Sequence, residues 1–549
     1  MRTKFFIAFI MFFFQNNFGQ HLHLKISSEQ ASEKTIIDST NYNKLHKNAK
    51  SIENEINSVS NQLIRKGYLR IQKNELKKAN DSTFDIKLAL GEKTKHLYIC
   101  LDQNSKFLNA ENDTIKLKFE NTEDFLNQSL NKLEKKGQSL ARLQLINFRN
   151  WNNKLYADLE IKIEKNRKID DIIINGNSKF PESHLKQLKR QYTKKTFNQE
   201  TLKKLHSEIE KFKFVKQTKY PEILFTQDST KIYTYLEKTK PNSFDGFIGF
   251  NNIENKLKLN GYLDLKLMNI LNTGEKFNIF WKSNGNQQKT FDTNIELPYI
   301  LKSPLAIKAQ LNIFKQDSTF QNAKTEIDLG YYIKYNSKIY IGYQSTESSD
   351  IQNTNNTTIS DFNSNFFTTQ FEYSNSNSND LLFSEKTRLN IKTGFGSRVS
   401  NLKKNKQHFT QINISHNFYL NNKNIINITS YNFYLKSDSY IINELYRFGG
   451  SNSIRGFNEN SLQGNISTLL TTEYRYVFNQ SFYLHSIIDY GYFEDKTTSL
   501  TSNLKSFGFG AGLLTKNGTL NIAFANGSTK SKNKTNQNSI FHISYKTHF

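Results

Sequence analysis

The sequence is short of cysteine and proline, and each shortage limits what the protein can be. Its 549 residues include one cysteine, Cys100, and 5 prolines. One thiol cannot close an internal disulfide or build a zinc cluster, and the 11 histidines show no metal-ligand spacing. We therefore expect no metal and no cofactor. A chain with almost no cysteine is compatible with a periplasmic location, where free thiols would be oxidised.

Acidic residues are also scarce. Asp and Glu total 50 against 75 Lys and Arg, which gives a formal net charge of +25 at pH 7. A basic chain suggests nucleic-acid binding, but here the basic residues are spread over an Asn-rich background, and no dense run lies beside a recognisable nucleic-acid module. We expect no nucleic-acid partner. The excess charge instead favours contact with the anionic headgroups of membrane lipid.

Long apolar runs are missing as well. The mean hydropathy of −0.66 argues against a bundle of transmembrane helices, and no downstream run reaches the roughly 20 residues that a spanning helix needs. Near the N-terminus, Arg2 and Lys4 precede an uncharged run at residues 5–14, and Gly19 follows. This order is typical of a secretory signal peptide. We predict a signal peptide at residues 1–19, cleaved before Gln20.

Aromatic residues, in contrast, are abundant: 44 Phe and 27 Tyr, a composition that favours strands. Between residues 20 and 240 helical and strand patterns recur, and we predict three α+β units at 20–91, 92–166 and 167–240, each strand–helix–helix–strand–strand. The first helix is unclear in the first two units. Helices are expected at 51–66, 123–136, 182–190 and 198–212, and strands at 68–71, 84–90, 96–101, 140–147, 155–163, 172–174, 223–226 and 232–237.

Residues 241–549 lack helical periodicity and contain about sixteen alternating runs, an even number as transmembrane barrels require. We predict an all-β transmembrane barrel of about 16 antiparallel strands here, with a large soluble β-sandwich as the alternative. The expected strands are 244–252, 256–269, 275–282, 290–299, 305–314, 325–333, 338–344, 366–373, 386–395, 408–419, 424–435, 466–478, 482–493, 506–514, 519–525 and 539–549.

The final strand shows the alternation most clearly. Phe541, Ile543, Tyr545 and Phe549 fall on one face, and the intervening residues are polar. A period of two places the aromatic and aliphatic face toward lipid and the polar face toward a wet lumen. The sequence therefore indicates an outer-membrane location for the barrel, with the N-terminal units in the periplasm.

A loop between the eleventh and twelfth expected strands resembles a family signature. It contains Gly449, Gly450, Ile454, Arg455, Gly456 and Phe457, and Ile454 to Phe457 match the IRGF loop of the BamA/TamA outer-membrane insertase superfamily. The three N-terminal units are similar to the POTRA domains of that family, the clearest likeness being at residues 169–180. Phe549 resembles the terminal aromatic by which such barrels are recognised for insertion. Three units are closer to a TamA-type member than to BamA, which usually carries five.

Strand parity selects partners for the loop arginine. Asp489 and Glu473 are expected to point into the lumen, so we predict that Arg455 pairs first with Asp489 and second with Glu473, which would fix the loop to the wall. The alternative is a solvated loop arginine. The family pattern likewise has an acidic residue before a glycine on this strand, as at Asp489 here.

Gly508, Gly510 and Gly512 share the inward parity of their strand, and form a bare strip on the barrel's inner face. Such strips occur where another backbone approaches closely, and the folded-in loop is the obvious candidate. A merely weak strand is the alternative. The run lacks the spacing and the following helix of a phosphate-binding loop.

The resemblance implies a factor that binds unfolded outer-membrane or secreted client polypeptides, with periplasmic accessory subunits, and inserts or exports them without enzymatic chemistry. The first strand, with Phe247 and Gly249, would meet the last, with Ile543 and Tyr545, at a seam that opens laterally. Glycine and asparagine in the first strand weaken its pairing. The alternatives are a two-partner secretion translocator that passes one client through the lumen, and a passive porin.

Overall fold

The computed structural model describes residues 21–549 except 103–112, 254–255, 285–287, 354–357, 377–379, 381, 402, 452 and 532–533. The expected signal peptide lies outside these residues. The chain divides into two compact units: one contains the residues up to Arg167 together with Thr196–Gln199, and the other contains Lys168–Lys195 and Glu200–Phe549. None of the described helices is long and apolar enough to cross a membrane.

The first module has two helices, of which the second is the one predicted at 51–66, on one sheet of order β2-β1-β5-β3, with β4 also on β5 and β1 parallel to β5. Its long helix begins at Asn48, whose side chain accepts from Ser51 N, and it ends before Gly67 at φ +102°. Residues 68–71, expected as a strand, form the turn after this helix, because Tyr68 N donates back to Leu63 O at 3.1 Å. The elements are β1 (Leu22–Ser27), α2 (Ala31–Asp38), β2 (Leu45–His46), α3 (Ala49–Arg65), β3 (Gln72–Lys73), β4 (Lys77–Lys78) and β5 (Thr83–Ala89).

The second module differs from the expected pattern by one element. Where a first helix was expected, the described residues contain a strand, β7, whose Ile115 and Leu117 pack against the module's core. Its alternating sequence TIKLK suits a half-buried strand. The sheet order is β7-β6-β9-β8 with β6 parallel to β9, so β8 lies at an edge. The elements are β6 (His96–Cys100), β7 (Thr114–Lys118), η2 (Phe119–Asn121), α4 (Thr122–Lys135), β8 (Arg142–Trp151) and β9 (Lys154–Lys162).

The third module belongs to the second compact unit. It carries both expected helices on a sheet of order β10-β12-β11, with β10 parallel to β12. Leu188, Leu202, Leu205 and Ile209 of the helices are fully buried. Its elements are β10 (Asp171–Asn175), α5 (Glu182–Tyr192), α6 (Gln199–Ile209), β11 (Val215–Phe225) and β12 (Thr230–Lys238).

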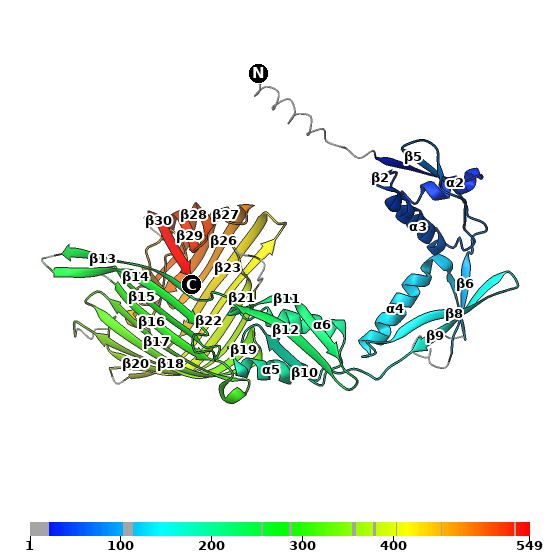
Figure 1. Cartoon of the computed structure of the whole chain (residues 1–549). Helices are drawn as coiled ribbons and strands as arrows, with labels where there is room; N and C mark the ends of the chain where they lie inside the picture. Colours follow the sequence, from blue (N-terminus) through cyan, green and yellow to red (C-terminus); the bar gives the residue numbers. More distant parts are fainter. Residues whose placement is uncertain are drawn as a thin grey trace, which may run out of the picture. The chain divides into compact units, whose positions relative to one another are not determined.

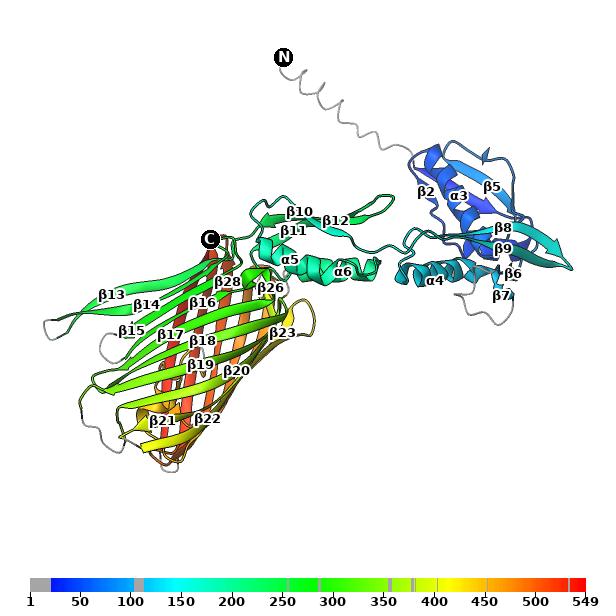
Figure 2. The same cartoon turned by 90° about the horizontal axis from the view of Figure 1, so that it is seen from below.

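The remaining residues form a closed barrel of sixteen antiparallel strands, which confirms the predicted fold class (Figures 1 and 2). Each expected strand corresponds to one in the structure. They are β13 (Ser243–Ile253), β14 (Lys256–Met268), β15 (Lys276–Asn284), β16 (Gln288–Leu297), β17 (Leu305–Gln316), β18 (Phe320–Lys334), β19 (Ser337–Asp350), β20 (Phe362–Ser376), β21 (Glu385–Ser400), β22 (Lys403–Tyr419), β23 (Asn424–Lys436), β26 (Ile466–Asn479), β27 (Phe482–Asp495), β28 (Leu500–Thr515), β29 (Gly518–Ser531) and β30 (Lys534–His548).

Burial along the strands is inverted relative to a soluble protein. On β18, Ile327 and Leu329 are 66% and 54% exposed, whereas Glu326 and Asp328 are 3% and 2% exposed. Large apolar side chains point outward and charged ones point into the lumen, which is the pattern of a barrel surrounded by lipid. This pattern excludes the soluble β-sandwich.

Candidate functional site

The loop between β23 and β26 begins and ends in a short hairpin, β24 (Tyr446–Phe448) paired with β25 (Leu462–Gly464). Two glycines turn the chain after β24. Gly449 has φ +113° and Gly450 has φ +98°, and a Cβ at Gly449 would lie 2.5 Å from Asn458 O. Only glycine fits this combination of backbone conformation and close packing. Gly449 and Gly450, both part of the predicted motif, therefore shape the loop.

Arg455 contacts both carboxylates that strand parity selected. Its Nε donates to Asp489 Oδ2 at 2.9 Å, its Nη2 donates to Asp489 Oδ1 at 2.5 Å, and its backbone N donates to Oδ2 at 3.1 Å. Nη1 pairs with Glu473 Oε1. Arg455 is 8% and Asp489 2% exposed, so the bidentate pair is removed from bulk water.

Glu473 is shared between two arginines. Its second carboxylate oxygen accepts from Arg475 Nε at 2.7 Å, and Arg475 Nη1 donates to Asn417 Oδ1 at 3.0 Å. The Arg475 guanidinium also lies 4.4 Å from the centre of the Phe383 ring. A network in which each buried charge has an opposite partner offsets the cost of removing the charges from water.

An apolar cluster completes the loop's attachment, and the barrel residues of this cluster were not among the predicted site residues. Ile454 and Phe457 of the motif are 0% and 4% exposed and pack with residues of the wall. Three apolar side chains, Leu469, Phe493 and Leu504, interrupt the polar inner face of β26, β27 and β28. Such interruptions of an otherwise polar inward parity are the sequence signal that could have located this contact.

The glycine strip on β28 is covered by neighbouring side chains, so the expectation that the loop lies on it is wrong. A Cβ at Gly510 would collide with His485, and one at Gly512 with Tyr483, both on β27. A Cβ at Gly508 would collide with the Phe524 carbonyl oxygen on β29. The strip makes room for the bulky side chains and backbone of its neighbours in the wall.

The loop meets the wall backbone one strand further on. A Cβ on Gly456 would collide with the backbone of Gly527 on β29, and the reverse holds for Gly527. Gly456 also has φ +78°, which favours glycine independently. The close approach of two backbones that the strip suggested is therefore made at Gly527.

The barrel closes through a very short seam between β13 and β30. The recorded pairs are Ser243 with His548 and Phe244 with Thr547, and Phe549 N donates to Asn242 O at 3.1 Å. Phe247 and Gly249 pair with β14, while Ile543 and Tyr545 pair with β29. Continuing the register would place Phe247 opposite Ser544, but no pair is recorded there among the described residues.

Comparison with known families identifies the barrel. The model of the Omp85 superfamily domain matches residues 269–549, which is more than half of the chain. The chain belongs to the Omp85 superfamily. This places the protein in the outer membrane. No curated protein sequence matches the chain.

Two solved structures, both of CdiB, share the fold of this Omp85 chain at low sequence identity. CdiB from Escherichia coli matches at a TM-score of 0.50 and 11% identity over 91% of this chain and 98% of that one. CdiB from Acinetobacter baumannii matches at 0.51 and 11% over 82% and 89%. BamA from Haemophilus ducreyi lacking POTRA domains 1-3 matches at 0.48 and 15% over 82% and 99%.

In this Omp85 protein the third module is joined to the barrel through a buried histidine. His184 of α5 is fully buried, with its ring centre 4.7 Å from that of Tyr299 and 5.4 Å from that of Phe214. A Cβ at Gly274 would collide with the imidazole. Burial, together with the nearby ammonium of Lys276, lowers the pKa of His184 to about 3. The histidine is therefore neutral at ordinary pH.

Proposed function

We propose that this Omp85 protein is an assembly factor that binds client polypeptides through its periplasmic modules and inserts or exports them through a laterally opening barrel, without covalent chemistry. The clients are unfolded outer-membrane or secreted polypeptides, delivered with accessory subunits in the periplasm. The presence of three modules supports a TamA-type role within the superfamily.

The observation that carries the proposal is the length of the seam. β30 pairs with β29 over fourteen residue pairs and β13 with β14 over eleven, but β13 and β30 share two recorded pairs. Opening the barrel here breaks the fewest backbone hydrogen bonds. The freed edges would then pair with a client strand, so that no backbone group is left unsatisfied in lipid.

A sheet edge in the second module supports client capture before insertion. β8 ends the sheet, and its pairing with β9 is interrupted between Ile146 and Arg149. Phe148, within this irregularity, and Trp151, beyond it, are 56% and 65% exposed. An extended client segment could add to such an edge by main-chain hydrogen bonds, with the aromatic side chains contacting its apolar residues.

The test is a disulfide across the seam in a Cys100→Ser background. The paired positions Phe244 and Thr547 would carry the cysteines, because opposed residues in antiparallel strands have Cα atoms about 4.5–5.5 Å apart, within the range of a disulfide. The control is a cysteine pair at Leu520 and Tyr545, which are opposed on β29 and β30. We expect client assembly to stop on oxidation of the seam pair, to continue on oxidation of the control pair, and to resume after reduction.

The same variants separate the alternatives. If assembly continues with the seam oxidised, lateral opening is not the mechanism, and a translocator that passes a dedicated client through the lumen replaces it. Sustained large conductance in liposomes without any client would instead indicate a passive porin.

A further inference from the structure

The lumen contains a cavity that the proposed assembly function does not use. Its volume is about 370 Å³, and it lies between strands β16 to β23 and the loop that joins β23 to β26, here called the lumen loop. Two of its lining residues show at which end of the barrel it lies, since Phe314 is near the end of β17 and Phe362 is at the start of β20. The turns that contact the third module lie at the opposite end. Cavities of about 300–1,000 Å³ are typical of small-molecule sites.

One wall of this cavity is a fixed aromatic surface. Phe366 and Phe409 are 5% and 6% exposed, and their rings meet edge to face with centres 5.0 Å apart. The rings of Phe433 and Tyr446 stack with centres 4.6 Å apart. Packed rings of this kind present an apolar surface that requires little rearrangement when a ligand binds.

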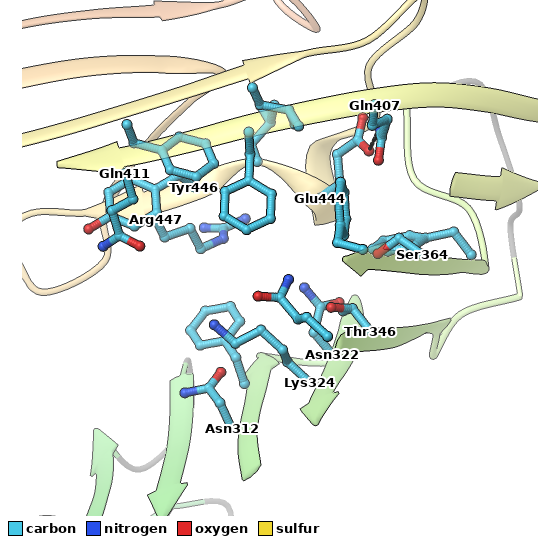
Figure 3. A pocket seen from close by; sticks show the side chains of 18 of the residues that line it. Asn312, Asn322, Lys324, Thr346, Ser364, Gln407, Gln411, Glu444, Tyr446 and Arg447 are labelled. Atoms are coloured by element: carbon cyan, nitrogen blue, oxygen red, sulfur yellow. Dashed lines mark hydrogen bonds between the residues drawn. The ribbon is translucent and has the colours of Figure 1, made fainter. Parts of the chain in front are cut away.

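The facing wall is polar. Figure 3 shows Asn312, Asn322, Lys324 and Thr346 extending from their strands toward the side that carries Tyr446 and Arg447. The cavity therefore has an apolar side and a side of amide, hydroxyl and cationic groups. A ligand that fills it needs both an apolar part and a polar part.

The charges that line the cavity do not balance. Lys392 is neutralised by Glu326 at 2.5 Å, and the single lining carboxylate, Glu444, is occupied by Arg398. The remaining two cations, Lys324 and Arg447, form no ion pair within 4.0 Å with any residue that the structure describes. This leaves two positive charges that face each other across the cavity, Lys324 on β18 and Arg447 on the loop.

Arg447 is held in place without being neutralised. Its guanidinium lies 5.4 Å from the ring centre of Phe314 and 5.2 Å from that of Phe320, and Nη1 donates to Gln316 Oε1 at 3.3 Å. A guanidinium has five N–H donors in a planar fork that fits a carboxylate. An anion bound here would make a direct contact with a cation that Asp317 and Asp495 attract only from beyond 4.0 Å.

We propose that this cavity binds a single-chain carboxylate amphiphile, a fatty-acid-like molecule. The carboxylate is received by Arg447 and Lys324, and the chain lies against Phe366, Phe409 and Phe433. A volume near the lower end of the range for ligand sites suits one short chain. The bound molecule bridges the lumen loop, through Arg447, to strand β18, through Lys324.

The test is binding of decanoate to the full-length protein in an uncharged detergent, followed by ligand-observed NMR and by the thermal unfolding midpoint. We expect saturable binding and a rise in the midpoint, because a ligand that binds only the folded state stabilises it. Arg447→Gln and Lys324→Gln should each weaken binding at least about tenfold, the loss expected for one charge-assisted contact. Using both variants keeps the test informative if one of them does not fold.

The matched control is Lys289→Gln, since Lys289 is an exposed lysine on β16 beside the cavity-lining Thr290. It should bind decanoate like the unmodified protein. Equal effects of decanoate on all variants would mean that it only partitions into the micelle, and this result overturns the proposal. Decanol binding as tightly as decanoate would overturn the role of the two cations.

Discussion

Arg455 and Asp489 are joined by three hydrogen bonds, two from the guanidinium at 2.9 and 2.5 Å and one from the Arg455 backbone N at 3.1 Å. The backbone contact fixes the main chain of the loop as well as the side chain. The loop's position relative to β27 therefore depends directly on this carboxylate.

Arg455→Ala should destabilise the barrel and impair function more than Arg475→Ala. Removing Arg455 leaves Asp489, which is 2% exposed, with a buried charge and no guanidinium partner. Breaking a buried pair from one side typically costs about 3–5 kcal/mol. Arg475→Ala should cost less stability, because Glu473 keeps Arg455 as a partner when Arg475 is removed. Urea unfolding of both variants in detergent measures the difference.

A double variant tests whether Arg455 and Asp489 stabilise the barrel as a pair. Arg455→Met with Asp489→Leu replaces both charges by apolar groups, and its loss of stability should be smaller than the sum of the two single losses. Additive losses would mean that Arg455 and Asp489 do not act as a pair.

Strand parity explains why much of the site could be predicted. In a barrel every second residue faces the lumen, so the parity of Asp489 and Glu473 follows from the outward apolar residues of their own strands. The number and order of the sixteen strands also followed from this alternation, whereas the register between neighbouring strands did not. The first module's turn at Tyr68 was predicted as a strand because Tyr68 and Ile71 are apolar, but they pack against the module's core from the end of the helix rather than within a sheet.

The path of the loop through the lumen could not be predicted in this way. Its contact with Gly527 depends on where Gly456 lies after two glycine turns, and on the register between β28 and β29. Neither is encoded in the period of a single strand. For the same reason the glycine strip was assigned to the loop, although side chains of the adjacent strand occupy it.

The N-terminus provides a simple prediction about export. Cleavage between Gly19 and Gln20 should remove the charged start and the apolar run, and the intact mass of the membrane-purified protein measures it. A mass that includes Met1 would contradict the predicted signal peptide.

Client capture at the edge of β8 should depend on its exposed aromatic residues. Replacing Trp151 and Phe148 together by Ala removes a large apolar contact surface, and we expect client affinity to fall by about 2 kcal/mol, the scale of an aromatic hot spot. Binding of a labelled unfolded client to the purified protein measures the change. Leu69→Ala, at an exposed residue of the first module, is the control and should leave affinity unchanged. If the variant that lacks Trp151 and Phe148 binds the client with the same affinity as Leu69→Ala, capture occurs elsewhere.

The joint between the third module and the barrel should weaken in acid. His184 has a pKa of about 3 when docked, because burial and Lys276 oppose its charge, whereas Glu296 opposes the shift less strongly. An exposed imidazole has a pKa of about 6.5. The docked joint therefore has its full stability above about pH 6.5, and this stability falls as the pH drops from about 6.5 toward 3. At pH 5 the loss amounts to about 2 kcal/mol, from about 1.4 kcal/mol per unit.

A cysteine at Gln187 reports on this joint, because Gln187 is 6% exposed and its Nε2 donates to the Lys302 carbonyl oxygen at 2.8 Å in the docked state. In a Cys100→Ser background, the labelling of this cysteine by a small pH-tolerant thiol reagent should increase between pH 7 and pH 5, as undocking exposes it. In His184→Gln, which removes the titrating group, that increase should disappear. An equal increase in both proteins would assign the acid response to other groups and leave His184 as a packing residue only.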